Sequence, residues 1–246
     1  MNDNTKQKNS QNSDKQTEKS EPLFQRYSVL IYLRDLSIVI IGVLITLSIT
    51  DAINSYNQQE EIKGMLKLVK QELEDNRKNL EFVQDRWDGE QRILLYLSEN
   101  MKDVKKIPTD TLDRYSYSLG AIYSFTTKND SYDVLKNSTI KQYIKEKDLL
   151  PKLSKVYRGL SDLNGQLEIY SNKKSDSHNS MMENMDANDV ELFLNGNPYY
   201  RFDYALKEKK FRNFLLVGRT ILSPGLFEYC KRNLDQAIED IEKYGY

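Results

Sequence analysis

The sequence predicts an all-α protein: a single N-terminal transmembrane helix followed by a helical-bundle domain outside the membrane, whose first helix is long. Three observations predict this fold class. Residues 36–50 form an uncharged apolar run, residues 60–100 repeat apolar side chains every three or four positions, and Gly and Pro are scarce. Apolar steps of three and four mark one face of a helix, and Gly and Pro are the residues that disfavour helices most.

The apolar run is the predicted membrane anchor. Its sequence is LSIVIIGVLITLSIT, which places Ile, Val and Leu on every side of a helix, as in a helix surrounded by a large core or by lipid. With its apolar neighbours it reaches about 20 residues, or about 30 Å of helix, which is the thickness of the hydrocarbon layer. We therefore predict a transmembrane helix over residues 28–53. Its representative positions are Leu36, Ile40, Gly42, Leu44, Thr46, Leu47 and Thr50.

A cleaved signal peptide and a buried core helix are the alternatives. A signal peptide has a short basic leader and a small-residue cleavage site. Here the leader is long, and Thr50-Asp51-Ala52 matches a cleavage site poorly. The rest of the chain is strongly hydrophilic, which argues against a core large enough to bury this helix. The anchor is the prediction.

The distribution of Lys and Arg predicts the orientation. Lys15, Lys19, Arg26 and Arg34 precede the apolar run, whereas the first basic residue after it is Lys63. Basic flanks stay in the cytoplasm, so we expect an inner-membrane protein whose amino terminus is cytoplasmic and whose domain of residues 54–246 is periplasmic.

Residues 1–27 are predicted to be a disordered cytoplasmic tail. Positions 1–22 contain almost no apolar side chains. Such a segment cannot bury enough surface to offset the entropy of ordering.

Composition excludes several functional classes. The 36 basic and 37 acidic residues nearly cancel, which argues against nucleic acid as the main partner. Cys230 is the single cysteine, so no intramolecular disulfide can form, and His178 is the single histidine. We expect no metal, no cofactor and no catalytic site, and we expect His178 at the surface of a polar loop.

Residues 60–100 form the predicted long helix, and their apolar seam permits two interpretations. The seam is interrupted by Asn76 and by a polar gap around Glu90. A coiled-coil dimer stalk is one interpretation; the first helix of an intramolecular bundle is the other, and we favour it because the later helices need a partner face. The seam residues are Ile62, Leu66, Val69, Leu73, Leu80, Val83, Trp87, Leu94 and Leu97.

The rest of the chain predicts further helices separated by turn signals. A polar loop is predicted over residues 172–188. The predicted helices cover residues 111–125, 131–144, 148–172, 189–194, 199–221 and 226–244.

Two stretches resemble a known family. One contains Tyr32-Leu33 and Val39-Ile40-Ile41-Gly42-Val43-Leu44-Ile45, and the other reads Asn129-Asp130-Ser131-Tyr132-Asp133-Val134-Leu135-Lys136-Asn137-Ser138. Together they resemble an uncharacterised Bacteroidetes family of single-span membrane proteins, domain-of-unknown-function family six-zero-nine-zero, over roughly residues 28–170. The chain departs from its pattern at Tyr56-Asn57, where the family has Trp-Asn, and at Ser138 or Thr139, where it often has Gly. The family has no established activity, so the resemblance implies topology and fold only.

Asn129, Tyr132, Leu135 and Lys136 form the most individual motif, and we consider them a possible interaction site. The alternative is local structure, with Asn129 or Ser131 capping a helix whose Tyr132 and Leu135 pack inward at i and i+3. In the anchor, Gly42, Thr46 and Thr50 share one face, a spacing that permits close approach of two helices.

The function predicted from these observations is non-catalytic. The anchored helical domain is expected to mediate protein interaction at the cell envelope, with the lipid bilayer and an envelope protein or a second copy as partners. A ligand-sensing domain with a Tyr-lined pocket, which regulates a membrane partner, is the alternative.

Overall fold

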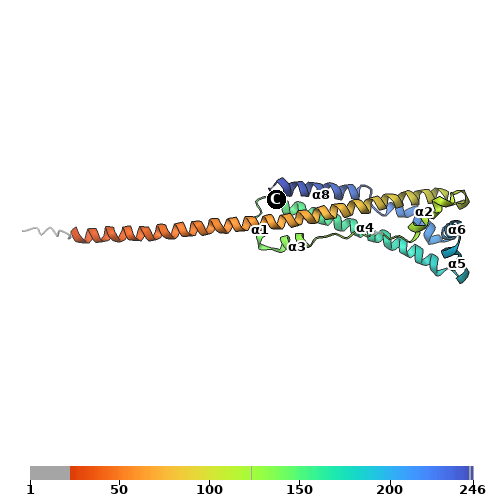
Figure 1. Cartoon of the computed structure of the whole chain (residues 1–246), viewed down its shortest axis with the longest axis horizontal. Helices are drawn as coiled ribbons and strands as arrows, with labels where there is room; N and C mark the ends of the chain where they lie inside the picture. The colour runs from red at the N-terminus through yellow and green to blue at the C-terminus, as the bar shows by residue number, and fades with distance from the viewer. Residues whose placement is uncertain (1–22, 123, 244, 246) are drawn as a thin grey trace, which may run out of the picture. The chain divides into compact units, whose positions relative to one another are not determined.

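The computed structural model describes residues 23–122, 124–243 and 245, with side chains from residue 31 onward. All regular structure in these residues is helical, which confirms the all-α class with a long first helix (Figure 1). The helices are α1 (Leu23–Asn100), η1 (Val104–Lys106), α2 (Thr109–Gly120), α3 (Asp130–Asn137), η2 (Thr139–Tyr143), α4 (Leu149–Glu183), α5 (Ala187–Asn195), α6 (Pro198–Lys207), α7 (Lys209–Val217), η3 (Gly218–Thr220) and α8 (Leu226–Lys243).

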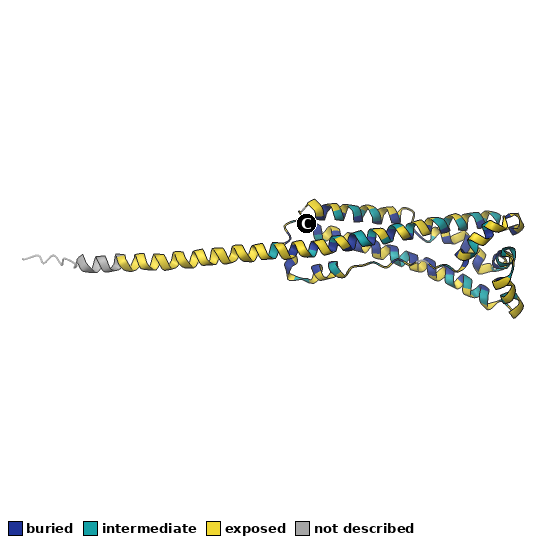
Figure 2. Cartoon of the chain, in the orientation of Figure 1, coloured by how far each residue is buried: buried dark blue, intermediate teal, exposed yellow. Residues whose placement is uncertain are grey.

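The chain divides into two compact units, residues 1–56 and residues 57–246. In the first unit every side chain from residue 31 to residue 56 is exposed (Figure 2). Among the described residues, α1 is the one helix long and apolar enough to cross a membrane, and its most apolar window has no buried residue. The alternative of a buried core helix is therefore not what the structure shows. Of the predicted tail, residues 1–22 lie outside the described residues, and residues 23–27 belong to α1 instead.

Hydroxyl groups within the apolar stretch bond to the helix itself. Thr46 Oγ1 donates to the carbonyl of Gly42 at 2.9 Å, and Thr50 Oγ1 donates to the carbonyl of Thr46 at 2.9 Å. Polar groups in hydrocarbon must be satisfied internally. Because of these bonds, neither hydroxyl needs a partner on a second helix.

The core of residues 57–246 contains side chains of α4, α8 and the part of α1 in this unit, together with side chains of the shorter helices. Lys70 on α1 pairs with Glu242 on α8 at 2.7 Å. Further along α1, Gln84 donates to Glu228 at 2.9 Å, so α8 runs antiparallel to α1.

Helix α4 runs parallel to α1. Tyr157 donates to Glu72 at 2.5 Å, and Tyr170, later in α4, donates to Glu90, later in α1. When two helices of one chain run parallel, the chain between them must return along the bundle. Residues 101–148 supply it.

The returning connection contains η1, α2, α3 and η2, and polar side chains of α1 hold the segment that leads into α3. The amide group of Asn76 donates to the carbonyl of Lys128 at 2.7 Å and accepts from its N–H at 2.8 Å. One turn earlier in α1, the Glu72 carboxylate accepts from the backbone N–H of Ser131 at 2.6 Å. Residues 124–129, which lie outside the regular helices, thus satisfy part of their backbone through α1.

The apolar seam of α1 is buried within this one chain, which favours the bundle over the dimer stalk. All nine seam residues, from Ile62 to Leu97, are at most 7% exposed. Their partners come from the other helices, including Leu160 and Leu167 of α4 and Leu234 of α8. A stalk seam would be exposed in a single chain.

Several predicted helix bounds are wrong. Helix α4 continues to Glu183, so the polar loop predicted over residues 172–188 does not exist over most of its length. The helix predicted over residues 111–125 ends at Gly120, and that over residues 131–144 gives way to η2 after Asn137. The helix predicted over residues 199–221 is divided at Glu208. The last turns of α4 are polar because they bury only one narrow face.

Two glycines of the bundle should respond oppositely to alanine. At Gly64 an added Cβ meets no atom within 4 Å. Gly64→Ala should therefore raise the free energy of unfolding by about 0.5–1 kcal/mol, which is the difference in helix propensity between Gly and Ala in a helix interior. Gly225 has the same open space but a φ of +78°, so Gly225→Ala should lower it by about 1–2 kcal/mol. Urea unfolding of the full chain in micelles measures both. Equal effects would contradict the backbone assignment.

Candidate functional site

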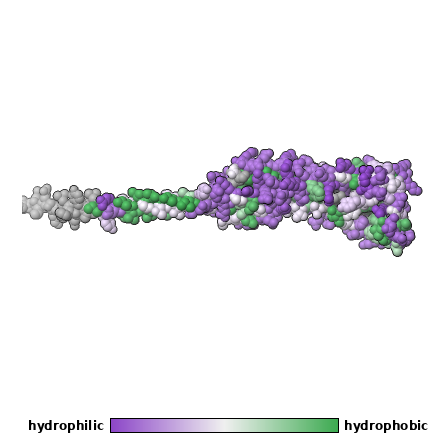
Figure 3. Space-filling view, in the orientation of Figure 1, coloured by the Kyte–Doolittle hydropathy of each residue, from purple (hydrophilic) through white to green (hydrophobic). Residues whose placement is uncertain are grey.

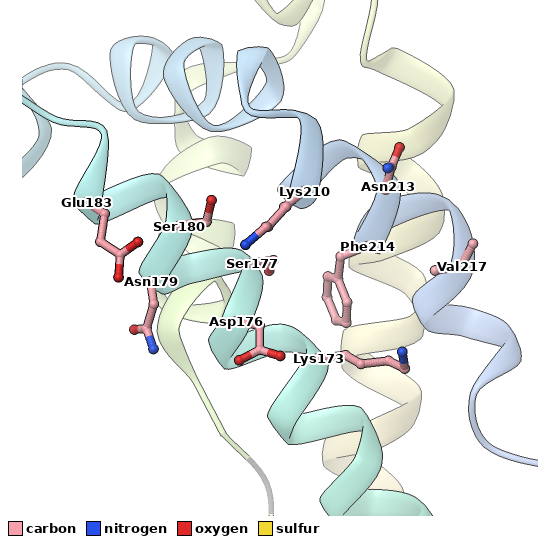
Figure 4. A pocket seen from close by; sticks show the side chains of 10 residues that line it. All are labelled: Lys173, Asp176, Ser177, Asn179, Ser180, Glu183, Lys210, Asn213, Phe214 and Val217. Carbon is pink, nitrogen blue, oxygen red and sulfur yellow. The ribbon is translucent and has the colours of Figure 1, made fainter.

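An open groove between α4 and α7 is the candidate functional site. Its volume is about 440 Å³. Figure 4 shows the side chains of the two helices facing each other across it. The lining residues are Lys173, Asp176, Ser177, Asn179, Ser180 and Glu183 from α4, and Lys210, Asn213, Phe214 and Val217 from α7.

Charges of both signs line the groove. Lys173 and Lys210 are cationic, Asp176 and Glu183 are anionic, and in the described part of the chain none of the four makes an ion pair. Elsewhere on the surface neighbouring charges do pair, for example through the several ion pairs that α1 makes with α8. The groove therefore presents donors and acceptors that the chain itself leaves unused.

The floor of the groove is buried and touches the polar interior. Phe214 is 4% exposed and Ser177 is 3% exposed. The Phe214 ring packs against Tyr170 with 5.3 Å between ring centroids, and the Ser177 hydroxyl donates to the carbonyl of Lys174 at 2.7 Å. Through these contacts the groove adjoins a cluster of charged side chains inside the bundle.

Glu90 and Lys174 form a buried ion pair beneath the groove. The Lys174 Nζ atom lies 2.6 Å from Glu90 Oε1, and the two side chains are 4% and 1% exposed. Tyr170 donates its hydroxyl to the same Glu90 oxygen, whereas Glu90 Oε2 has no hydrogen-bond partner among the described residues. Burial lowers the pKa of Lys174, and the Glu90 carboxylate opposes that shift. A buried pair of this kind depends on both members, because either one alone is an uncompensated charge.

The single tryptophan reports on this cluster. Trp87 meets Tyr170 edge to face with ring centroids 4.7 Å apart, and it also lies 6.4 Å from the Phe227 ring. A displacement of Tyr170 therefore changes the surroundings of the one indole in the chain. Its fluorescence is a natural probe of the bundle.

His178 is part of α4 and lies near α2, so the expectation of a surface loop is wrong. It occupies α4, one turn after Lys174, and an added Cβ on Gly120 would lie 4.0 Å from its Cε1 atom. Its Nδ1 atom is buried without a partner among the described residues. Burial, with a smaller contribution from the Lys174 charge, lowers the pKa of His178 below its ordinary 6.5.

Acidification should destabilise the bundle through His178. Between its lowered folded pKa and 6.5 the unfolded chain binds a proton that the folded chain does not, so stability is complete above 6.5 and falls as the pH decreases through this window. His178→Gln should flatten this part of the pH profile of the unfolding free energy. Urea titrations of both proteins across the window measure the difference. Parallel profiles would contradict the burial of the imidazole.

The structure places the predicted motif of residues 129–136 largely inside the fold. Tyr132 and Leu135 are buried, and the Tyr132 ring stacks on Tyr157 at 4.2 Å. Asn129 binds the Asp133 side chain, and the Lys136 ammonium lies 5.9 Å from the centroid of the Tyr132 ring. The local-structure interpretation accounts for the buried Tyr132 and Leu135, but the predicted Asn129 cap is wrong: its side chain makes no capping hydrogen bond, and the Ser131 N–H donates to Glu72 instead. A recognition role of the exposed Asn129 and Lys136 stays a prediction.

The sequence pattern does not predict the groove or the ion pair, because the polar residues 172–183 indicate a loop and not the end of α4. One signal was present: Glu90 and Asn76 interrupt the apolar seam, and both are buried with polar partners. A charged residue at a core position of a helix calls for an opposite charge on the facing helix. Lys174 is that residue.

The fold and the groove define an all-α protein with one helix apolar enough to span a membrane and an open, mixed-charge groove on its helical domain. Comparison with protein-family models, with curated proteins and with solved structures gives no match.

Proposed function

We propose that this chain is a single-pass protein of the inner membrane whose periplasmic helical domain binds another envelope protein and catalyses no reaction. Its amino terminus would lie in the cytoplasm, as the basic residues before the apolar run favour. The uncovered apolar side chains of residues 31–53, visible as a hydrophobic band in Figure 3, fit a lipid environment. On the motifs quoted above we also propose membership of domain-of-unknown-function family six-zero-nine-zero.

The groove between α4 and α7 is the observation that carries the binding role. Small apolar ligands bind in enclosed, mainly apolar pockets. This groove instead combines an aromatic floor at Phe214 with four unpaired charges. A polypeptide segment supplies apolar and charged side chains together. Val217, at the α7 end of the groove, is 51% exposed and extends the apolar surface.

The charges define the partner further. A partner segment that fits the groove has an apolar side chain that contacts Phe214 and Val217. One acidic and one basic residue flank this side chain. The acidic residue would meet Lys210, and the basic residue would meet Asp176. Complementary charges of this kind act mainly on specificity and on the rate of association.

Photo-crosslinking in growing cells tests the proposal. A benzophenone amino acid in place of Asn213, in the groove, should give one discrete adduct with an envelope protein, and mass spectrometry should map it to a segment of the stated chemistry. Lys210→Glu should abolish the adduct. Lys209→Glu is the matched control, because Lys209 is an equally exposed lysine of α7 that does not line the groove. Absence of an adduct, or an adduct that survives Lys210→Glu, would refute the docking site; an adduct between two copies would make the partner a homo-oligomer.

A labelling test of the proposed topology needs an introduced cysteine. The native Cys230 is 2% exposed, its thiol donates to the carbonyl of Gly159, and burial raises its pKa to about 11. It should not react in the folded protein. In a Cys230→Ala background, Lys145→Cys places a thiol at an exposed position. A membrane-impermeant maleimide should label it in intact cells; labelling only after lysis would reverse the orientation.

A second candidate function is ligand sensing. The observation that favours it is a cavity lined by two tyrosines, Tyr199 and Tyr200, beside α6. Ligand binding there would regulate a membrane partner through the bundle. A change in Trp87 fluorescence on ligand addition, with the crosslink at Asn213 altered in parallel, would favour sensing over constitutive binding.

A further inference from the structure

A second cavity lies between the turn after α1 and helix α6, away from the groove. Its volume is about 580 Å³. Its apolar surfaces include Val104 and Leu206, each 6% exposed and part of the core. Helix α6 packs against η1, so the two sides of the cavity belong to one packed region.

Two tyrosine rings form a wall of the cavity, and their hydroxyls are already bound. Tyr199 donates to the carbonyl of Ile107 at 2.8 Å, and Tyr200 donates to Asp189 at 2.6 Å. The bond to Asp189 raises the pKa of Tyr200 to about 12, so this phenol stays a neutral donor. Each ring is thereby anchored at its polar end. What the cavity offers a ligand at this wall is aromatic surface.

The charges of the cavity do not balance. Lys207 pairs with Asp203 at 2.6 Å, and Asp103 pairs at 3.6 Å with Lys106, which does not line the cavity. Lys102 and Lys105 line it as well. Neither makes an ion pair within the ranges that the structure describes. Two lysines without a counter-charge therefore line the same cavity as Tyr199 and Tyr200.

We propose that this cavity binds a small aromatic carboxylate. Its carboxylate would be held by Lys102 and Lys105, and its flat apolar body would lie against the rings of Tyr199 and Tyr200. An ammonium group attracts a carboxylate as a point charge with several donors, and offset or edge-on contact between aromatic rings adds to simple burial. The inference does not depend on the docking groove, and it assigns a ligand class to the sensing alternative.

Calorimetric titration of the full chain in lipid nanodiscs tests the proposal with three probes. They are 2-naphthoate, the neutral 2-naphthalenemethanol and inorganic phosphate, with empty nanodiscs as the blank. Naphthoate should bind at least about tenfold more tightly than either of the others, because only it offers both the charge and the ring. Equal affinity for the neutral alcohol or for phosphate would overturn the proposal, as would the absence of naphthoate binding.

Matched lysine variants locate the site. The double variant Lys102→Gln/Lys105→Gln should weaken naphthoate binding at least about tenfold. The control variant Lys145→Gln/Lys147→Gln removes two charges from exposed positions that do not line the cavity, and it should leave naphthoate binding unchanged. Unchanged affinity in the double variant, or equal loss in the control, would place the probe elsewhere and refute the site. Because the crosslink at Asn213 concerns another surface, this failure is distinguishable from failure of the docking proposal.

Discussion

Replacement of Lys174 by methionine should lower the free energy of unfolding by about 3–5 kcal/mol, the range for breaking a buried ion pair by removing one partner. The Lys174 and Glu90 side chains are 4% and 1% exposed, so water cannot solvate the carboxylate that remains. Tyr170 still donates to one Glu90 oxygen, but a neutral donor does not compensate a full charge. The uncompensated charge of Glu90 then destabilises the packed bundle relative to the unfolded chain.

Two further variants separate this effect from loss of packing. Lys173→Met removes the same charge from an exposed position one residue earlier in α4 and should change stability by less than about 0.5 kcal/mol. The double variant Glu90→Leu/Lys174→Met replaces the pair by apolar side chains and should recover most of the loss. Urea unfolding followed by Trp87 fluorescence measures all three, because Trp87 contacts Tyr170. If Lys174→Met cost no more than Lys173→Met, the buried pair would be refuted.

The predictable parts of the fold are those in which an apolar pattern continues over many residues. The apolar stretch of residues 36–50 is long enough to identify a helix, and the seam from Ile62 to Leu97 identifies both a helix and its buried side. Helix α8 was predicted almost to its ends for the same reason. Local composition is sufficient where the pattern is long.

The parts that were not predictable depend on contacts between segments distant in sequence. Residues 172–183 read as a loop because they are polar, yet they extend α4, since Lys174, Ser177 and Met181 lie on one buried face. The charge on that face is tolerated only because Glu90 lies opposite, a fact that no local pattern contains. The position of residues 124–129, outside the regular helices, likewise depends on Asn76, which interrupts an apolar seam when considered alone. The groove depends on the length of α4, because its α4 side consists of residues between 173 and 183.

The second large effect concerns Glu72, which fixes the returning connection to two helices at once. Its carboxylate accepts from the N–H groups of Ser131 and Tyr132 at the start of α3. It also accepts from the hydroxyl of Tyr157, on α4, at 2.5 Å. Burial, and then the carboxylate, raise the pKa of Tyr157 well above its ordinary value, so the hydroxyl remains a donor. One side chain thus serves as the cap of α3 and as the acceptor of a buried phenol.

Glu72→Ala should therefore lower the free energy of unfolding by about 3 kcal/mol or more, since each buried donor left without an acceptor costs about 1–3 kcal/mol. Glu74→Ala, at an exposed position of the same helix, should cost less than about 0.5 kcal/mol. Tyr157→Phe removes one orphaned donor, so Glu72→Ala/Tyr157→Phe should be more stable than the sum of the single losses predicts. Hydrogen exchange supplies an independent measurement: in Glu72→Ala the amides of Ser131 and Tyr132 should lose protection before those of α8, because the connection detaches while the long helices stay packed. Equal loss of protection throughout the bundle would show instead that Glu72 acts on global stability and does not hold α3 in place.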